Sequence, residues 1–224
     1  MMPPNRLVFL IDVDNTLLDN DRVEADLKEH LEREFGTDCS RRYWEIFETL
    51  RAELGYADYL GALQRYRLDH LNDPSLLLMS AFLVDYPFEQ RLYRHVFDVI
   101  RHLDTFGQTV ILSDGDVVFQ PRKVQRSGLW SAVQGRVLIY IHKEQMIDAI
   151  SERFPATHYV LVDDKLRILQ AMKRILGERL TTVFPRQGKY AFDPNNIRDY
   201  AAADITVESI GDLLGHDFSA LISA

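Results

Sequence analysis

A run of five apolar residues that ends in two acids constrains the fold of this chain most. Residues 7–11 (LVFLI) are all apolar and lead directly into Asp12 and, one residue further on, Asp14. A continuous apolar run of this length is typical of a strand that is buried on both faces of a parallel sheet. Ligands of open parallel sheets bind outside the carboxyl ends of the strands. We therefore expect Asp12 and Asp14 to lie at the edge of a sheet, facing a crevice.

The same two acids predict a cation. Neighbouring carboxylates repel each other, and this repulsion destabilises the fold unless something balances it. A divalent cation relieves the repulsion, and Mg²⁺ is usually held by one or two carboxylates together with phosphate oxygens of a substrate. Mg²⁺ is therefore the expected cofactor.

The later part of the chain alternates between strands and helices. Runs typical of strands are separated there by segments in which apolar residues recur with helical spacing. The expected strands are 108–113, 136–141, 158–162, 180–184 and 204–207, and the expected helices are 92–106, 121–126, 146–154, 166–176 and 208–214. This alternation predicts an α/β fold, a Rossmann-like parallel sheet with right-handed crossovers and helices on both faces.

A helical insert separates the first strand from this alternating part. No convincing strand occurs between residues 21 and 84, and helical spacing predicts helices at about 23–35, 43–54, 59–68 and 74–84. Gly36 and Gly55 follow the first two as stop signals, and Asp73 with Pro74 is typical of a helix start. The expected organisation is an α/β core of residues 1–18 and 90–224 with an all-helical cap of residues 19–89.

Polar residues follow several of the expected strands. Ser113 and Asp114 lie at the end of the second expected strand, Lys143 lies shortly after the third, and Asp163 and Asp164 follow the fourth. Taken singly, these are ordinary residues: a turn serine, a solvated lysine and acids at the start of a helix. In a parallel sheet, however, all of these strand ends lie on one edge. The sequence therefore predicts that these residues converge on the first pair of acids.

The converging groups suit the chemistry of a phosphate monoester. Asp12 can attack phosphorus and form an aspartyl-phosphate, while Asp14 can protonate the leaving oxygen and then take a proton from water. The Ser113 hydroxyl, the amides beside it and the Lys143 ammonium can stabilise charge on the phosphoryl oxygens. Asp163 and Asp164 can complete the Mg²⁺ site. This arrangement makes Asp12, Asp14, Ser113 and Lys143 the candidate catalytic residues, and Ser113, Asp114 and Lys143 the candidates for binding substrate.

The order of these residues resembles the four motifs of the haloacid dehalogenase-like (HAD) superfamily. The resemblance extends from about residue 7 to residue 165, and the insert lies where that superfamily places its type-1 cap. It implies that Asp12 is the nucleophile and Asp14 the acid/base. It further implies that Ser113 and Lys143 bind phosphate and that Asp164, in preference to Asp163, ligates Mg²⁺.

The acid at position 14 favours phosphoryl transfer among the reactions of this superfamily. A halide leaving group needs no proton, and the superfamily's dehalogenases lack this acid. Phosphonate cleavage there uses a cap lysine, and nothing around Lys28, the only lysine of the insert, indicates an activated amine. A phosphomutase would keep the same motifs and stays open. A non-catalytic HAD-like binding protein is disfavoured because no motif residue is missing. The expected function is hydrolysis of a small phosphorylated metabolite.

Substrate choice is expected to depend on the insert, which can close over the crevice and exclude water. Its cationic and aromatic candidates are Arg41, Arg42, Tyr43, Trp44, Tyr56, Tyr59, Arg65, Tyr66 and Arg67. Loop 185–189 follows a strand and is a further candidate to border the site. Tyr43 also fits the buried stripe of its helix, and surface positions explain most of the others.

Composition limits the remaining partners. The formal charge is −8, with 34 acids against 26 lysines and arginines, which argues against a nucleic-acid surface. The basic clusters at 41–42 and 122–126 are interpreted as solvated faces.

The single cysteine, Cys39, allows no internal disulfide, and no signal peptide is indicated, so we expect a cytoplasmic location. The apolar run 76–84 is too short to cross a membrane about 30 Å thick. The oligomeric state is not indicated.

Overall fold

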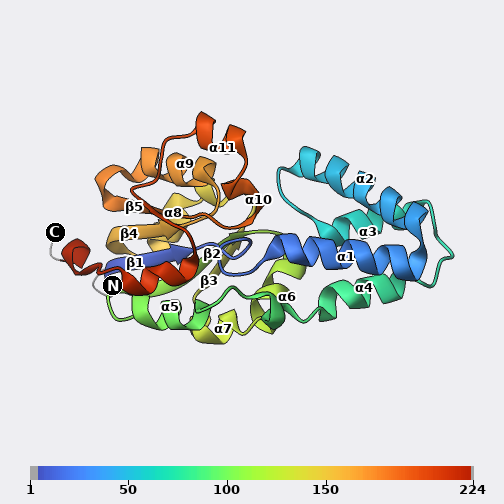
Figure 1. Cartoon of the computed structure of the whole chain (residues 1–224), viewed down its shortest axis with the longest axis horizontal. Coiled ribbons are helices and arrows are strands. Elements are labelled where there is room, and N and C mark those ends of the chain that lie inside the picture. The colour runs from blue at the N-terminus through green and yellow to red at the C-terminus, as the bar shows by residue number, and fades with distance from the viewer. Residues whose placement is uncertain (1–4, 223–224) are drawn as a thin grey trace.

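A six-stranded sheet, in which all strands run parallel, forms the centre of the molecule (Figure 1). The computed structural model describes residues 5–222. The strands are β1 (Asn5–Ile11), β2 (Gln108–Asp114), β3 (Val137–Tyr140), β4 (Ala156–Val162), β5 (Leu180–Pro185) and β6 (Ile205–Val207). Their order in the sheet is β3-β2-β1-β4-β5-β6, so the strand order reverses beside β1. This confirms the predicted α/β fold.

Strand β1 is buried on both faces, as its apolar sequence predicts. Phe9 and Ile11 belong to one apolar cluster, whereas Val8 and Leu10 belong to a second. The first cluster includes residues of α5 (Val96–Leu103) and α6 (Phe119–Arg126), and the second includes residues of α8 (Ile147–Arg153) and α9 (Leu166–Leu176). Because alternate side chains of a strand point to opposite faces, helices cover both sides of the sheet.

Several short elements complete the part of the chain around the sheet. The short α-helices are α7 (Leu129–Ala132), α10 (Gly188–Ala191) and α11 (Pro194–Asp199). The 3₁₀ turns are η1 (Phe88–Arg91), η2 (Lys143–Gln145), η3 (Gly177–Arg179), η4 (Ile210–Gly215) and η5 (Ser219–Ile222).

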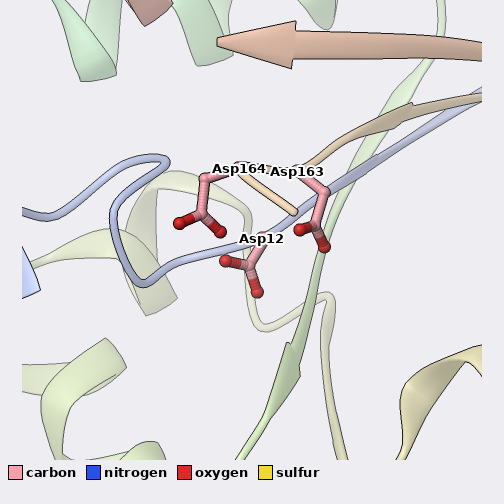
Figure 2. Close-up of side chains that lie close together, drawn as sticks. All are labelled: Asp12, Asp163 and Asp164. Atoms are coloured by element: carbon pink, nitrogen blue, oxygen red, sulfur yellow. The ribbon is translucent and has the colours of Figure 1, made fainter. Parts of the chain in front are cut away.

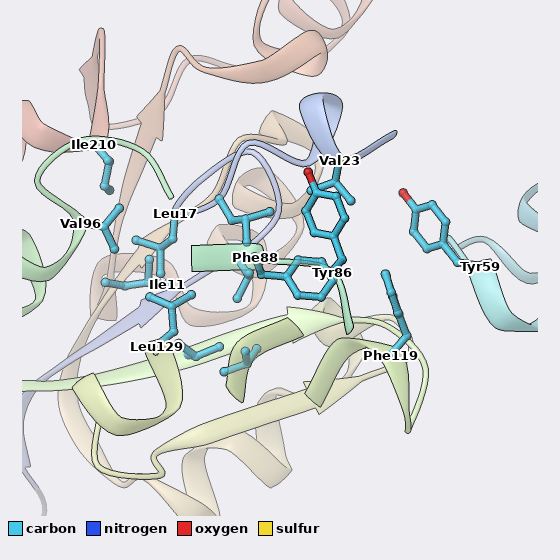
Figure 3. Packing of buried hydrophobic residues seen from close by; sticks show 14 of the residues in the cluster. Ile11, Leu17, Val23, Tyr59, Tyr86, Phe88, Val96, Phe119, Leu129 and Ile210 are labelled. Carbon is cyan, nitrogen blue, oxygen red and sulfur yellow. The ribbon is translucent and has the colours of Figure 1, made fainter. Parts of the chain in front are cut away.

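Four helices between β1 and β2 extend away from the sheet, to the right in Figure 1. They are α1 (Asn20–Phe35), α2 (Thr37–Leu54), α3 (Tyr59–Leu68) and α4 (Leu76–Asp85). Their apolar stripes pack into the same cluster that covers one face of the sheet. Tyr59 of α3 faces Phe119 of α6, with ring centroids 5.0 Å apart, so aromatic packing continues from the helices to the sheet (Figure 3).

The two chain segments that join these helices to the sheet are hydrogen-bonded to each other. Leu18 and Leu92 form an isolated antiparallel bridge. The Asp19 amide donates to the Arg91 carbonyl at 2.8 Å, and the Tyr93 amide donates to the Leu17 carbonyl at 3.0 Å. The helical segment is therefore attached through one paired connection.

Element boundaries differ from the sequence-based expectations at several helices. Helix α2 begins at Thr37 rather than at 43, because a new helix starts directly after Gly36. Helix α5 begins at Val96 rather than at 92, because Leu92 pairs with Leu18 and His95 has a left-handed backbone (φ 65°). Helix α4 begins at Leu76, because the Asp73 carboxylate accepts from the Ser75 amide and so caps a turn ahead of the helix. The segment expected to be a helix at 208–214 is the 3₁₀ turn η4.

The end of the described chain packs back on the central strand. The Phe218 ring lies edge-on to Phe9, with centroids 5.2 Å apart, and also contacts Phe106. Figure 1 shows the start of β1 and the end of η5 at the end of the sheet that points away from the four helices. No helix within residues 5–222 combines the length and apolar character that a membrane span requires.

Candidate active site

Three buried carboxylates meet where the strand order reverses. Asp12 follows β1, Asp163 and Asp164 follow β4, and one oxygen from each lies within 4.8 Å of the others. All three residues are buried. Figure 2 shows their carboxylates turned toward a common centre. Crevices at such a reversal are the usual ligand sites of open parallel sheets.

Lys143 neutralises part of this acidic cluster. Its Nζ lies 2.5 Å from Asp12 Oδ1 and 2.7 Å from Asp163 Oδ2, and donates to the Leu112 carbonyl at 3.2 Å. Burial opposes the charged form of Lys143, but the charges of Asp12 and Asp163 outweigh it and raise the pKa of the ammonium above its usual value. Burial raises the pKa of Asp12 to about 6, although Lys143 works in the opposite direction.

Four carboxylate oxygens of the cluster have no hydrogen-bond partner among residues 5–222: Asp12 Oδ2, Asp163 Oδ2 and both oxygens of Asp164. Of these four, Asp163 Oδ2 has an ion-pair partner, Lys143 Nζ at 2.7 Å. Burial beside Asp163 and Asp12 raises the pKa of Asp164 well above its usual value, with Lys165 acting against this shift. Buried carboxylates without partners are costly unless a cation binds them. The oxygens of Asp12 and Asp164 therefore fit a divalent cation such as Mg²⁺, whereas Asp163 is engaged by Lys143.

Ser113 and Asp114 lie at the end of β2, where the sequence places them. The Ser113 hydroxyl is buried and accepts from Gln120 Nε2 at 2.9 Å. Asp114 Oδ1 accepts from the backbone amide of Lys143 at 2.7 Å, which ties the loop after β3 to the end of β2. His142 adopts a left-handed backbone (φ 58°) just before this contact.

Asp14 lies apart from the carboxylate cluster and has its own cation. Lys123 of α6 is completely buried, and its Nζ lies 2.6 Å from Asp14 Oδ1 and 2.9 Å from Asn20 Oδ1. Gln120 Nε2 donates to Asp14 Oδ2 at 3.2 Å as well as to Ser113. The expectation that the basic cluster 122–126 is a solvated face is therefore wrong for Lys123. Its signal was the helical spacing, since Lys123 lies four residues after the buried Phe119.

A cavity of about 250 Å³ is bordered by α1, α2 and α3 and by loops at the sheet edge. Of the strand-end residues predicted from the sequence, Asp14 and Asp114 line it. It is lined by Asp14, Asn15, Asn20, Glu24, Arg51, Gly55, Tyr56, Ala57, Tyr59, Asp114, Gln120, Lys165, Arg167, Lys189 and Tyr190. Gly55 approaches His142 so closely that an added Cβ would lie 2.7 Å from the imidazole. A larger cavity of about 800 Å³ between α1 and α2 contains none of the strand-end residues, so the smaller one is the candidate site.

The structure selects among the substrate-binding candidates. Of the nine residues expected from the insert, only Tyr56 and Tyr59 line this cavity. Tyr43 is wholly buried and donates to the Tyr59 carbonyl at 3.0 Å. Lys189 lies on the cavity wall, as expected of its loop. Sequence reasoning missed Gln120, Lys123 and Tyr190, which come from helices rather than from strand ends.

Comparison with known proteins finds relatives among solved structures. No family model matches the chain, and no curated protein matches it. A protein of Burkholderia xenovorans LB400, described as a candidate haloacid dehalogenase-like hydrolase, is 65% identical, with 99% of this chain and 100% of that chain covered and a TM-score of 0.93. YfnB of Bacillus subtilis, described as a candidate HAD hydrolase and solved with bound magnesium, is 18% identical, with 95% and 98% covered and a TM-score of 0.64. An L-2-haloacid dehalogenase of Xanthobacter autotrophicus is 20% identical, with 93% and 96% covered and a TM-score of 0.59. The last two similarities concern the fold alone.

Proposed function

We propose a function from the premise that this chain belongs to the haloacid dehalogenase-like hydrolases, as its 65% identity to the Burkholderia protein over 99% of its length shows. We infer that it is a Mg²⁺-dependent phosphatase that hydrolyses a small phosphate monoester through an aspartyl-phosphate. The observation that supports this most is Asp14. It lines the cavity two residues after Asp12 and is held there by Lys123 and Gln120.

The first half of the reaction transfers the phosphoryl group to Asp12. A carboxylate oxygen of Asp12 attacks phosphorus as the bond to the leaving oxygen breaks, and Asp14 gives that oxygen a proton. Lys143 contacts Asp12, and the buried Ser113 hydroxyl lies at the end of the neighbouring strand β2. Both can donate hydrogen bonds to the phosphoryl oxygens. Mg²⁺ held by Asp12 and Asp164 would neutralise the acids and polarise the phosphoryl group.

The second half releases phosphate. Asp14, now deprotonated, takes a proton from a water molecule, and the resulting hydroxide attacks phosphorus and frees Asp12. Each turnover therefore consumes one water and returns both acids to their starting state. Release of an alcohol needs this proton transfer, whereas release of a halide does not. This difference supports a phosphatase over a dehalogenase.

Hydrolysis of p-nitrophenyl phosphate, measured with Mg²⁺ and after chelation, tests the proposal. We expect Mg²⁺-dependent activity that Asp12→Asn abolishes, while Asp148→Asn, which replaces an exposed acid on α8, retains it. We expect Asp14→Asn to lower kcat by roughly 10²- to 10⁴-fold for an alkyl phosphate, the usual contribution of general acid–base catalysis. Its effect on p-nitrophenyl phosphate should be smaller, because nitrophenolate leaves without a proton.

Two other outcomes would assign a different reaction. Turnover of 2-chloropropionate without turnover of any phosphate ester would make the chain a dehalogenase and overturn the proposal. Conversion of a sugar phosphate into its isomer, without release of inorganic phosphate, would make it a phosphomutase. No activity on any of these substrates would indicate a binding protein.

A further inference from the structure

The 250 Å³ cavity is lined by acids and cations that differ in how completely they are paired within the protein. Its three lining acids all have partners. Asp14 is bound by Lys123, Glu24 pairs with Lys189 at 2.5 Å, and Asp114 accepts from the Lys143 amide. The acids of the wall are therefore satisfied within the protein.

The lining cations are satisfied less completely. Lys189 forms an ion pair with Glu24, and Arg167 forms one with Glu144 at 2.8 Å. Arg51 has only Glu48, one turn earlier on its own helix, at 3.5 Å, and Glu48 is 62% exposed. Exposed pairs of this kind contribute little. Lys165 forms no ion pair within 4 Å among residues 5–222, although the charges of Asp164, Asp12 and Asp163 outweigh its burial and raise its pKa.

Arg51 and Lys165 both lie next to the ring of Tyr190. The guanidinium carbon of Arg51 lies 5.8 Å from the centre of the Tyr190 ring, and Lys165 Nζ lies 5.2 Å from it. The Tyr190 hydroxyl makes no hydrogen bond with residues 5–222. Arg51 is near the end of α2 and Tyr190 is in α10, two elements that face each other across the cavity (Figure 1).

The backbone is arranged to hold Tyr190 at this position. Gly188 has a left-handed backbone (φ 67°) and lies so close to the Asn15 side chain that any Cβ would clash with it. The amide of Lys189 then donates to Asp21 Oδ2 at 2.6 Å. Both contacts fix the start of α10 against the segment that follows Asp12 and Asp14.

We propose that the substrate carries a second anionic group on its leaving-group side, bound by Arg51 and Lys165 with Tyr190 between them. The proposal rests on the proposed function, because it identifies the class of phosphate ester that the same site hydrolyses. Three cations face the Tyr190 ring, and Glu24 pairs only with Lys189. A carboxylate or phosphate that contacts Arg51 and Lys165 reduces the remaining repulsion. The small cavity, about 250 Å³, restricts the link between the phosphoryl group and the second anion to a few atoms.

A matched pair of substrates tests this inference. Carboxymethyl phosphate and ethyl phosphate differ only in the carboxylate that replaces a methyl group, and ethane-1,2-diyl bisphosphate supplies a phosphate instead. We expect kcat/KM to be at least about tenfold higher for the better of the two substrates with a second anionic group than for ethyl phosphate, as charge-assisted hydrogen bonds imply. The comparison between carboxymethyl phosphate and the bisphosphate identifies which anion the site prefers.

Variants connect this preference to the named residues. The preference is the kcat/KM for the substrate with a second anion divided by the kcat/KM for ethyl phosphate. Arg51→Met and Lys165→Met should each reduce this ratio by about tenfold, mainly by raising the KM for the substrate with the second anion. Arg51→Lys should retain part of the preference. Arg33→Met, which removes an exposed arginine of α1, serves as the control and should leave the ratio unchanged. Because the ratio is measured on one protein sample, partial unfolding cancels from it.

The possible failures are distinguishable. If no phosphate ester is hydrolysed, the proposed phosphatase function is wrong. If ethyl phosphate and both anionic substrates are hydrolysed equally well, the function stands and the anion site is overturned. An anionic preference that survives both Arg51→Met and Lys165→Met would overturn the assignment to these residues.

Discussion

At the scale of single residues, the burial of Lys123 has the clearest consequence. Its ammonium is wholly buried and contacts Asp14 and Asn20. Lys123→Met would leave Asp14, whose side chain is 26% exposed, with Gln120 as its side-chain donor, and would remove the donor to Asn20 Oδ1. We expect a loss of about 3 kcal/mol in the free energy of unfolding, as for other broken buried pairs. Chemical denaturation measures it, and Lys28→Met, which removes an exposed lysine of α1, should change the stability by less than about 0.5 kcal/mol.

The carboxylate cluster makes a second prediction, which needs no substrate. Mg²⁺ should raise Tm, because binding to the folded state alone stabilises it by about 2.7 kcal/mol at a concentration 100 times Kd. Asp164→Asn removes a carboxylate whose oxygens have no partner in residues 5–222 and should abolish most of this shift. Asp163→Asn instead disturbs Lys143 and should retain more of it. Equal losses in the two variants, with Asp148→Asn unaffected, would contradict this division of roles.

The residues predicted from the sequence differ in kind from those that only the structure finds. Asp12, Ser113, Lys143 and Asp164 follow strands of one parallel sheet, so their convergence follows from topology alone. Lys123 approaches Asp14 from a helix 109 residues later in the chain. Helical spacing places Lys123 on the same face as Phe119, but whether that face is buried depends on tertiary packing.

At the scale of elements, an ionic cluster connects α1 to the segment that leads back to the sheet. Arg91 donates to Asp26 Oδ2 from Nη2 at 2.6 Å and from Nε at 2.8 Å, and the Tyr86 hydroxyl donates to the same oxygen. Burial works to raise the pKa of Asp26, but the hydrogen bonds from Tyr86 and Arg91 outweigh it, so the pKa is lowered. The cluster therefore stabilises α1 against η1 when Asp26 is ionised.

This lowered pKa gives a prediction with a definite sign. A carboxylate with a depressed pKa in the folded state adds stability above its unfolded pKa, near 3.9, and loses it as the pH falls through the folded pKa. Asp26→Asn should lower the free energy of unfolding by about 2 kcal/mol at pH 7, the scale of hydrogen bonds to a charged group. Below about pH 5 the difference between wild type and variant should shrink. A difference that stays constant down to pH 3 would contradict it.

Helices and strands were predictable to different degrees. Gly36 and Gly55 end α1 and α2 where the sequence indicates, because helix stops depend on local backbone freedom, whereas α2 begins before the expected residue 43. The start of α5 was not predictable, since the strand-like pairing of Leu92 with Leu18 competes with a helical pattern. Short elements such as α10 have too few turns to show any periodicity.

At the scale of the whole molecule, Phe218 joins the end of the described chain to the central strand. It is 3% exposed and packs on Phe9 and Phe106. Phe218→Ala should lower the free energy of unfolding by about 3 to 5 kcal/mol, the usual effect of removing a buried aromatic ring. Phe192→Ala removes a ring that is 58% exposed and should change it by less than about 0.5 kcal/mol. Urea denaturation of both variants measures the difference, and equal effects would contradict the role of Phe218.

Because Leu18 and Leu92 pair with each other, the helical segment between them could be replaced by another one. Its entry and exit are hydrogen-bonded to each other, so the chain enters and leaves the segment at one place. A different helical segment grafted between these two residues would leave the pairing of β1 with β2 and β4 untouched. The carboxylates and Lys143 would keep their places, while the wall that carries Arg51 and Tyr56 would be replaced. Chemistry and selectivity are thus separable in this architecture, and one could be redesigned without rebuilding the other.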